Sequence, residues 1–101
     1  MSRELVFHPL VQKDLNEIIA YYEDEASSEI ADLFEAEVRA ALLLIQANPL
    51  HYPFYLKQGI FRRFTLRTFP HLILFVVTKE AIRIMVLKHV KRSSKFGLKR
   101  R

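Results

Sequence analysis

The spacing of apolar residues changes once along this 101-residue chain, and that change constrains the fold more than any other feature. Up to about residue 45, apolar side chains recur every three or four positions, which is typical of helices. From residue 61 they follow the two-residue interval of strands. With a short apolar run at the start, the expected order is β-α-α-β-β-β. This order indicates one α+β domain, 1–101, with a helical hairpin packed on a small antiparallel sheet.

Two amphipathic stripes predict the hairpin. Pro9 suits the first turn of a helix, because its missing N–H costs little there. The pair Asn48-Pro49 stops the second helix, and a serine at the connection caps its start. We therefore expect helices over about 9–25 and 28–47. The stripes consist of Val11, Leu15, Ile18, Ile19 and Tyr22 in the first helix and of Ala31, Phe34, Val38, Ala41, Leu42 and Ile45 in the second.

Three β-rich runs follow an irregular segment over 49–59. The run 61–67 alternates between apolar and polar side chains. The run 71–77 is almost wholly apolar, as expected of a central strand that is covered on both faces. The run 82–90 also alternates, and its phase predicts two faces. Ile82, Ile84 and Val86 are expected on one face, and Arg83, Met85, Leu87 and His89 on the other.

One core is expected between the helices and the sheet, while the acidic side chains of the helices, Asp14 among them, are expected to form a solvated surface. Opposite charges on the helices and the sheet contribute little as exposed pairs, about 0–1 kcal/mol each. The residues expected in the core are Leu15, Ile18, Phe34, Val38, Leu42, Phe64, Ile73, Phe75 and Ile84.

The net charge of +5 hides a strong asymmetry between the two halves of the chain. Residues 1–50 carry three basic and ten acidic side chains, whereas residues 51–101 carry thirteen basic side chains and one acid. So basic a segment attracts polyanions such as nucleic-acid phosphates or an acidic protein segment. We therefore expect the second half, including the basic tail at about 93–101, to carry the binding surface. The tail sequence is compatible with either a short helix or disorder.

Several classes of protein are disfavoured by composition. There is no cysteine, hence no disulfide framework, thiolate nucleophile or cysteine-based zinc site. The four histidines lack the spacing of metal ligands, and the two glycines form no phosphate-binding loop, so we expect no metal and no cofactor. The first residues lack the apolar region of a signal peptide, and the longest apolar run is too short to span a bilayer. A cytoplasmic protein without a membrane partner is expected.

A set of short motifs resembles the RelE/ParE superfamily of bacterial type II toxin–antitoxin toxins. The likeness covers nearly the whole chain, and the long hairpin and the Phe-Pro-His turn place it closer to the ParE-like branch. Phe96 or Gly97 stands near the place where many relatives carry a tryptophan. The motifs are Phe7-His8-Pro9, Asp14-Leu15-Asn16-Glu17-Ile18, Tyr21-Tyr22, Ala31-x-x-Phe34, Arg62-Arg63-Phe64, Phe69-Pro70-His71 and His89-x-x-Arg92.

The resemblance implies a growth inhibitor, associated with plasmid stabilisation, whose target differs between the two branches. ParE-like relatives inhibit DNA gyrase without catalysis, whereas RelE-like relatives are ribosome-dependent mRNA endonucleases. A shared fold does not decide between them. Because groups that could act as acid or base are scarce, we predict a gyrase inhibitor. The first alternative is a ribosome-dependent mRNA endonuclease, and the second alternative is a non-toxic basic binding module. Whether the chain is an enzyme stays open.

Candidate site residues come from the basic half. RNA cleavage needs a base, an acid for the leaving oxygen and cations for the phosphorane. Because no tyrosine follows Tyr55, His89 is the candidate catalytic residue, and His71 is a poorer one. Arginines are the candidates for target or phosphate binding. They are Arg63, Arg67, Arg83 and Arg92, of which the first three are expected with His89 on or beside the sheet face away from the helices.

A cognate antitoxin is the partner that the resemblance implies. Its flexible C-terminal segment would wrap the toxin, and the charge of the second half predicts that this segment is acidic and amphipathic. It would cover the sheet and the open edge of the hairpin. The further partner is the target, either DNA gyrase or the ribosome with its mRNA.

Overall fold

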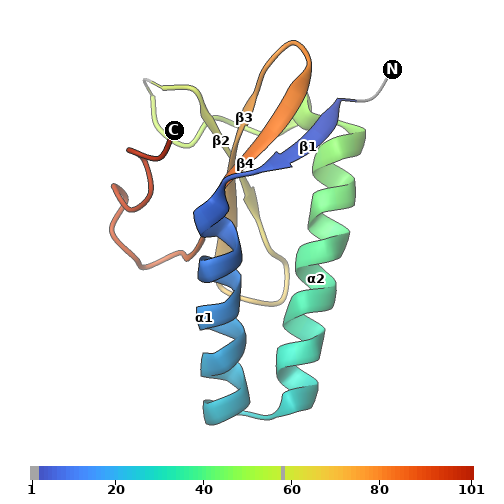
Figure 1. Ribbon diagram of the computed structural model, residues 1–101, viewed down its shortest axis with the longest axis vertical. Helices are drawn as coiled ribbons and strands as arrows, with labels where there is room; N and C mark the ends of the chain where they lie inside the picture. The colour runs from blue at the N-terminus through green and yellow to red at the C-terminus, as the bar shows by residue number, and fades with distance from the viewer. Residues whose placement is uncertain (1–2, 58) are drawn as a thin grey trace.

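The computed structural model describes residues 3–57 and 59–101. Within these residues, four strands, two long helices and a short 3₁₀ helix follow one another in the predicted order, so the α+β fold class is confirmed. The helices form a hairpin whose closed end extends beyond the sheet (Figure 1). The elements are β1 (Glu4–Phe7), α1 (Pro9–Glu25), α2 (Ser28–Ala47), η1 (Pro49–His51), β2 (Phe61–Thr65), β3 (His71–Val77) and β4 (Ala81–His89).

Local capping fixes the bounds of both helices, and the predicted bounds are confirmed. The Nδ1 atom of His8 accepts the Leu10 N–H at 3.1 Å at the start of α1. The Oγ atom of Ser27 accepts the Ile30 N–H at 3.1 Å at the start of α2. None of the helices in the described residues combines the length and the apolarity needed to cross a membrane.

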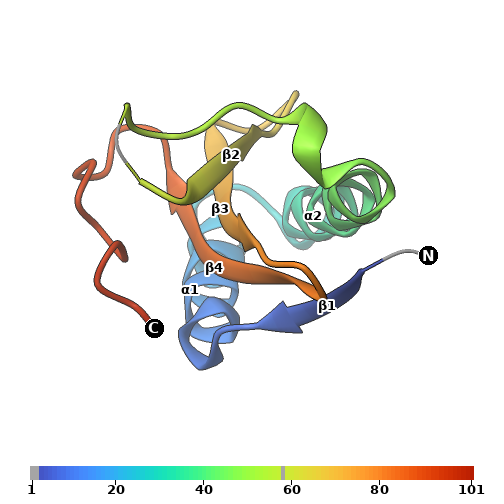
Figure 2. The same ribbon diagram turned by 90° about the horizontal axis from the view of Figure 1, so that it is seen from above.

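The sheet has the strand order β1-β4-β3-β2, so β3 and β4 are both internal (Figure 2). Strands β2, β3 and β4 pair in antiparallel fashion. Strand β1 instead runs parallel to β4, with Leu5 opposite Ile82. Because β1 pairs only as far as Ile84, the rest of the β4 edge needs other hydrogen-bond partners.

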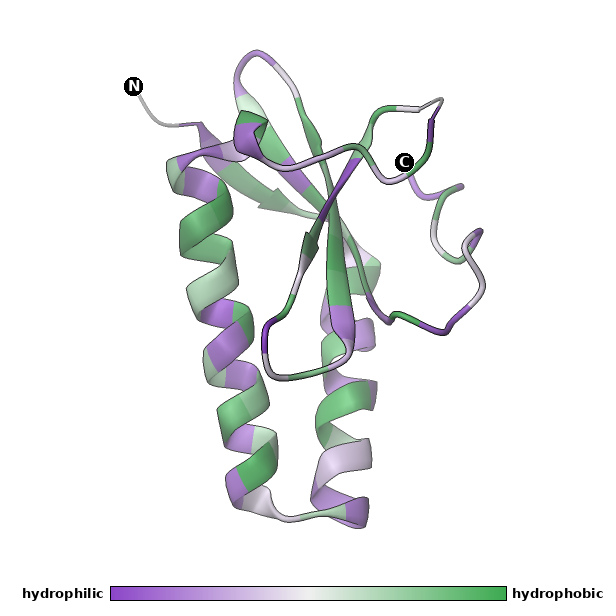
Figure 3. Ribbon diagram, turned by 180° about the vertical axis from the view of Figure 1, so that it is seen from behind, coloured by the Kyte–Doolittle hydropathy of each residue, from purple (hydrophilic) through white to green (hydrophobic). Residues whose placement is uncertain are grey.

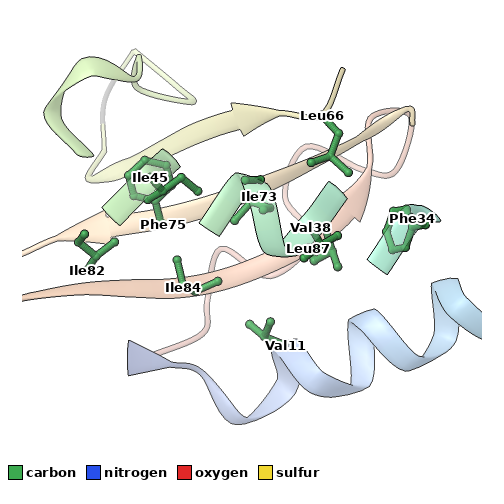
Figure 4. Close-up of a cluster of buried hydrophobic side chains, with 11 residues drawn as sticks. Val11, Phe34, Val38, Ile45, Leu66, Ile73, Phe75, Ile82, Ile84 and Leu87 are labelled. Atoms are coloured by element: carbon green, nitrogen blue, oxygen red, sulfur yellow. The ribbon is translucent and has the colours of Figure 1, made fainter. Parts of the chain in front are cut away.

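The main core lies between the sheet and the hairpin (Figure 4). Of the side chains predicted there, Phe34, Val38, Ile73, Phe75 and Ile84 are buried. The other four are partly buried and pack against this cluster. They are Leu15, Ile18, Leu42 and Phe64.

A second apolar cluster covers the face of the sheet away from the helices. This far face is occupied by every second residue of β3, which is why β3 is apolar along its length (Figure 3). Side chains from the segment before β2, from β2 itself and from the tail pack over it. The buried residues of the cluster are Leu72, Leu74, Val76, Met85 and Val86, and those packed against them are Tyr55, Phe61, Phe96 and Leu98.

A β-bulge in β4 makes the predicted phase of this strand wrong beyond Ile84. Leu74 of β3 pairs with Val86 and Phe75 pairs with Ile84, so Met85 is an additional residue on β4. The alternation therefore reverses, and Val86 lies on the far face instead of sharing the helix-facing side with Ile84.

The core assignment predicts that alanine substitutions at two nearby residues of α2 change the free energy of unfolding by very different amounts. Ile45 is fully buried, so Ile45→Ala should lower the free energy of unfolding by about 2–5 kcal/mol. Leu43 is 68% exposed, so Leu43→Ala should change it by less than about 0.5 kcal/mol. Urea unfolding of both variants checks this. Equal losses in the two variants would contradict the orientation of α2.

Candidate functional site

Two of the predicted binding arginines lie on the far face. Arg63 stands opposite Leu74 and Arg83 opposite Val76, both of which belong to the second cluster. Both arginines are half-buried, and the guanidinium of Arg63 donates to the Phe54 carbonyl at 3.1 Å. The far face is thus a covered apolar layer with arginines at its margin, and not an open basic strip.

The other two predicted arginines lie beyond the strand ends and are exposed. Arg67 follows β2, and its backbone N–H donates to Glu37 Oε2 at 2.7 Å. Burial opposes ionisation of Glu37, but this bond and the N–H of Thr68 outweigh it and lower the pKa of the carboxyl. Arg92 follows β4, and its Cζ atom lies 3.7 Å from the centre of the Phe96 ring. The four arginines therefore do not form one cluster.

Arg62 has a structural role, although the alternation of residues 61–67 places it on the same side of the strand as the apolar Phe64. It pairs with Phe75 and so belongs to the helix-facing side of β2. Its Nη1 atom donates to the Tyr52 carbonyl at 2.8 Å, and its Cζ atom lies 4.1 Å from the centre of the Phe54 ring. Arg62 thus holds the irregular segment before β2 in place.

A buried ion pair attaches the tail to the fold. Arg100 donates to both carboxylate oxygens of Asp14, from Nη1 to Oδ2 at 2.6 Å and from Nη2 to Oδ1 at 2.9 Å. The side chain of Arg100 is only 9% exposed and that of Asp14 only 5%. Asp14 Oδ2 also accepts the Leu87 N–H at 3.1 Å, and Arg100 donates to the Met85 carbonyl at 2.9 Å. The pair therefore provides hydrogen-bond partners for backbone groups of β4 that do not pair with β1.

The expectation that Asp14 is solvated is wrong. It lies on the apolar stripe of α1, three residues after Val11 and four before Ile18, so its helical position already indicated burial. Arg100 carried no comparable signal, because the tail has no periodic pattern. Sequence reasoning missed this pair for that reason.

Lys88 anchors the tail from the far face. Its side chain is buried opposite Leu72, and its Nζ atom donates to the Tyr55 hydroxyl at 2.7 Å and to the Ser93 carbonyl at 2.8 Å. Residues further along the tail pack closely against the far face of the sheet. At Gly97, which has φ +80°, an added Cβ would lie 2.5 Å from Val86 Cγ2. The tail is therefore an irregular but well-packed segment on the side of the sheet opposite α2 (Figure 2).

His71 and His89 face each other across β3 and β4, with ring centres 5.2 Å apart. His71 is buried against Tyr22 and Phe34 of the helices, so the pair lies on the helix-facing side and not on the far face as predicted for His89. Burial, and in second place the nearby His89, lower the pKa of His71 to about 4. His71 is therefore neutral at physiological pH.

The proton on His89 is placed by a backbone contact. Its Nδ1 atom accepts the Lys91 N–H at 3.0 Å, so the neutral ring carries its proton on Nε2. A general base needs a free lone pair, and the lone pair of this ring is engaged by Lys91. In this arrangement the ring presents an N–H donor at Nε2, and a role as general base would require the contact with Lys91 to break.

Two cavities open on the hairpin side. The first, of about 400 Å³, lies between α1 and the ends of β3 and β4 and contains both histidines and Arg92. The second, of about 220 Å³, is apolar and lies between the helices and the sheet, with Phe7, Leu15 and Leu42 in its wall. Among the described residues, no three His, Asp or Glu side chains are arranged to hold a metal ion.

The buried pair predicts that neutralising Arg100 destabilises the fold. Arg100→Met leaves the Asp14 carboxylate buried without its partner, and should lower the free energy of unfolding by about 3–5 kcal/mol. The matched control is Arg101→Met, which removes the same charge from an exposed neighbour and should change it by less than about 0.5 kcal/mol. Denaturant unfolding measures both. An Arg100→Met protein as stable as the control would contradict the role of the pair.

His71 predicts a loss of stability in mild acid. The unfolded chain protonates His71 near pH 6.5, but the folded protein does so only near pH 4, so between these values the unfolded state binds more protons. The free energy of unfolding should therefore fall by about 2 kcal/mol between about pH 7 and pH 5. His71→Phe should flatten this dependence, whereas His51→Gln, at an exposed position, should keep it. A slope that survives His71→Phe would assign the effect to other groups.

Comparison with known proteins identifies the family. Residues 5–94 match the family described as ParE toxin of type II toxin-antitoxin system, parDE. Toxin ParE2 of Mycobacterium tuberculosis, in strains CDC 1551 / Oshkosh and ATCC 25618 / H37Rv, is 33% identical over 89 residues, which is 88% of this chain and 83% of the relative. The chromosomal ParDE system from P. aeruginosa contains a chain with the same fold (TM-score 0.78, 18% identity, 86% of this chain and 95% of that chain). The chain therefore belongs to the ParE toxin family of type II toxin–antitoxin systems.

Proposed function

We propose that this toxin arrests bacterial growth by binding DNA gyrase in the cytoplasm, without a reaction of its own. The observation that carries the proposal is the engagement of His89, the candidate acid or base of the basic half, by the Lys91 N–H. Membership of the ParE toxin family supports the same reading.

The arrangement of cations also favours binding over cleavage. Stabilising a phosphorane requires several cations around one phosphate. Arg63 and Arg83 lie on the far face, whereas His89 lies on the helix-facing side. Of the four candidate arginines, only Arg92 lines the cavity that contains His89, which falls short of several cations around one phosphate. Exposed cations spread over several surfaces suit an extended contact with an acidic partner.

Two assays on the same purified protein test the proposal. The toxin should inhibit gyrase supercoiling, and His89→Gln should leave that inhibition within about twofold, because the residue transfers no proton in this mechanism. A translation extract should show no mRNA cleavage. Cleavage in the extract that His89→Gln abolishes would overturn the proposal and establish the endonuclease alternative.

Tail variants must preserve the buried pair to be informative. Truncation after Arg92 removes Arg100 and so destabilises the fold, which would mimic loss of function. Lys95 and Lys99 are exposed, so the double variant Lys95→Gln/Lys99→Gln tests the charge of the tail without that defect.

We further propose that an antitoxin with an acidic, amphipathic segment neutralises the toxin. Within the described residues, the basic half contributes only one ion pair, that of Arg100, so its exposed cations, such as Arg67 and Arg92, are available to such a segment. Apolar anchors would enter the 220 Å³ cavity, in whose wall Phe7 is 49% exposed.

Charge attraction predicts a salt-sensitive association rate. The Debye length falls from roughly 30 Å at 0.01 M salt to about 8 Å at physiological salt, so raising salt should slow binding of the co-expressed antitoxin markedly. The dissociation rate should change less, because apolar anchors determine release. Stopped-flow mixing measures both rates. An association rate that does not depend on salt, or a basic antitoxin, would count against this proposal.

A further inference from the structure

The 400 Å³ cavity beside the histidine pair has the size and chemistry of a ligand site, and it is separate from the apolar cavity proposed for the antitoxin. It lies between α1 and the ends of β3 and β4, and its volume falls within the range of small-molecule pockets. Aromatic rings and polar tips share its wall. The residues that matter are Glu17, Tyr21, Tyr22, His71, His89 and Arg92.

His71 supplies an independent sign of a missing partner. It is 4% exposed and lines the cavity, yet its buried Nδ1 atom finds no hydrogen-bond partner among the described residues. Buried polar atoms are nearly always hydrogen-bonded, so this exception leaves an unsatisfied polar atom within a residue of the cavity wall.

Hydrogen-bond donors dominate the polar part of this cavity. His89 carries its proton on Nε2, because Nδ1 accepts the Lys91 N–H. Arg92 lines the cavity, stacks on Phe96 and has no ion-pair partner within the described residues, so its positive charge is not compensated. Such donors fit an anion with several acceptor oxygens, as in a phosphate.

The carboxylates of the cavity do not cancel this preference. Asp14 is neutralised by Arg100 and by the Leu87 N–H. Glu17 pairs with Lys13 at 3.8 Å on the surface of α1. A carboxylate that is free to accept further hydrogen bonds suits the hydroxyls of a sugar or the amine of a base.

Flat side chains provide the remaining contacts. The rings of Tyr21 and Tyr22 meet edge to face, with centres 5.5 Å apart, and Tyr21 is 61% exposed. A base can stack on an exposed aromatic ring in the wall of a cavity whose wall also carries a cation for the phosphate. An acidic side chain of a peptide would leave these rings unused.

We propose that this cavity binds a nucleoside monophosphate unit, with the phosphate at Arg92 and His89 and the base against Tyr21. The unit can be a free mononucleotide or the terminal nucleotide of a strand, and both present the same chemistry. The proposal goes beyond gyrase binding and does not depend on it. The supercoiling assay tests whether gyrase is the target, and a separate binding measurement tests the nucleotide site.

Amide NMR titration of the full chain with adenosine monophosphate tests the proposal. Shifts should concentrate at the cavity, and binding should be at least about tenfold tighter than for inorganic phosphate or adenosine alone, because two sets of contacts combine. A 5′-phosphorylated trinucleotide distinguishes the two sources: tighter binding than the mononucleotide assigns the site to a strand end, and equal or weaker binding assigns it to the free nucleotide.

Matched variants separate a specific site from general basic charge. Arg92→Gln should weaken binding about tenfold, and Tyr21→Ala should weaken binding of the nucleotide but not of phosphate. Lys91→Gln, which removes the same charge from the exposed neighbour, should change affinity by less than about twofold. Equal weakening by Lys91→Gln, absence of shifts at millimolar nucleotide, or equally tight binding of a glutamate-rich peptide would each overturn the proposal.

Discussion

The bidentate contact between Asp14 and Arg100 is the interaction on which the rest of this structure depends. It joins α1, the free edge of β4 and the end of the chain at one buried point. Burying a carboxylate or a guanidinium alone costs several kcal/mol of desolvation, and pairing the two offsets this cost. Because β1 is short and parallel, the edge of β4 beyond Ile84 would otherwise lack partners at this point. The tail is thereby part of the folded domain, although it has no regular secondary structure.

This attachment decides which surfaces can bind partners. The tail, Lys88 and Tyr55 cover the far face of the sheet, so the basic second half presents its charge at margins and strand ends and not as one strip. The open cavities lie on the other side, beside the hairpin. The acidic antitoxin segment that we propose can therefore reach cations at the periphery and an apolar cavity beside the helices, while the cavity with the histidine pair is separate from both.

The regular elements could be predicted from the sequence because each depends on local periodicity. Both helices and β3 have the predicted bounds, and Phe34 and Phe75 are buried as expected. The contacts that define the site could not be predicted, because they join residues far apart in the chain: Asp14 and Arg100 are 86 positions apart. The bulge at Met85 likewise reversed the phase of β4, and so only the three-dimensional register reveals which side His89 faces.

Hydrogen exchange of the Leu87 amide tests the central claim most directly, because the acceptor of this N–H is Asp14 Oδ2 and not a neighbouring strand. If the buried pair holds the tail to the fold, this amide should exchange as slowly as amides in the centre of β3, and Arg100→Met should accelerate it beyond the change in global stability. Fast exchange of Leu87 in the unmodified protein, at the rate of an exposed loop, would contradict the account.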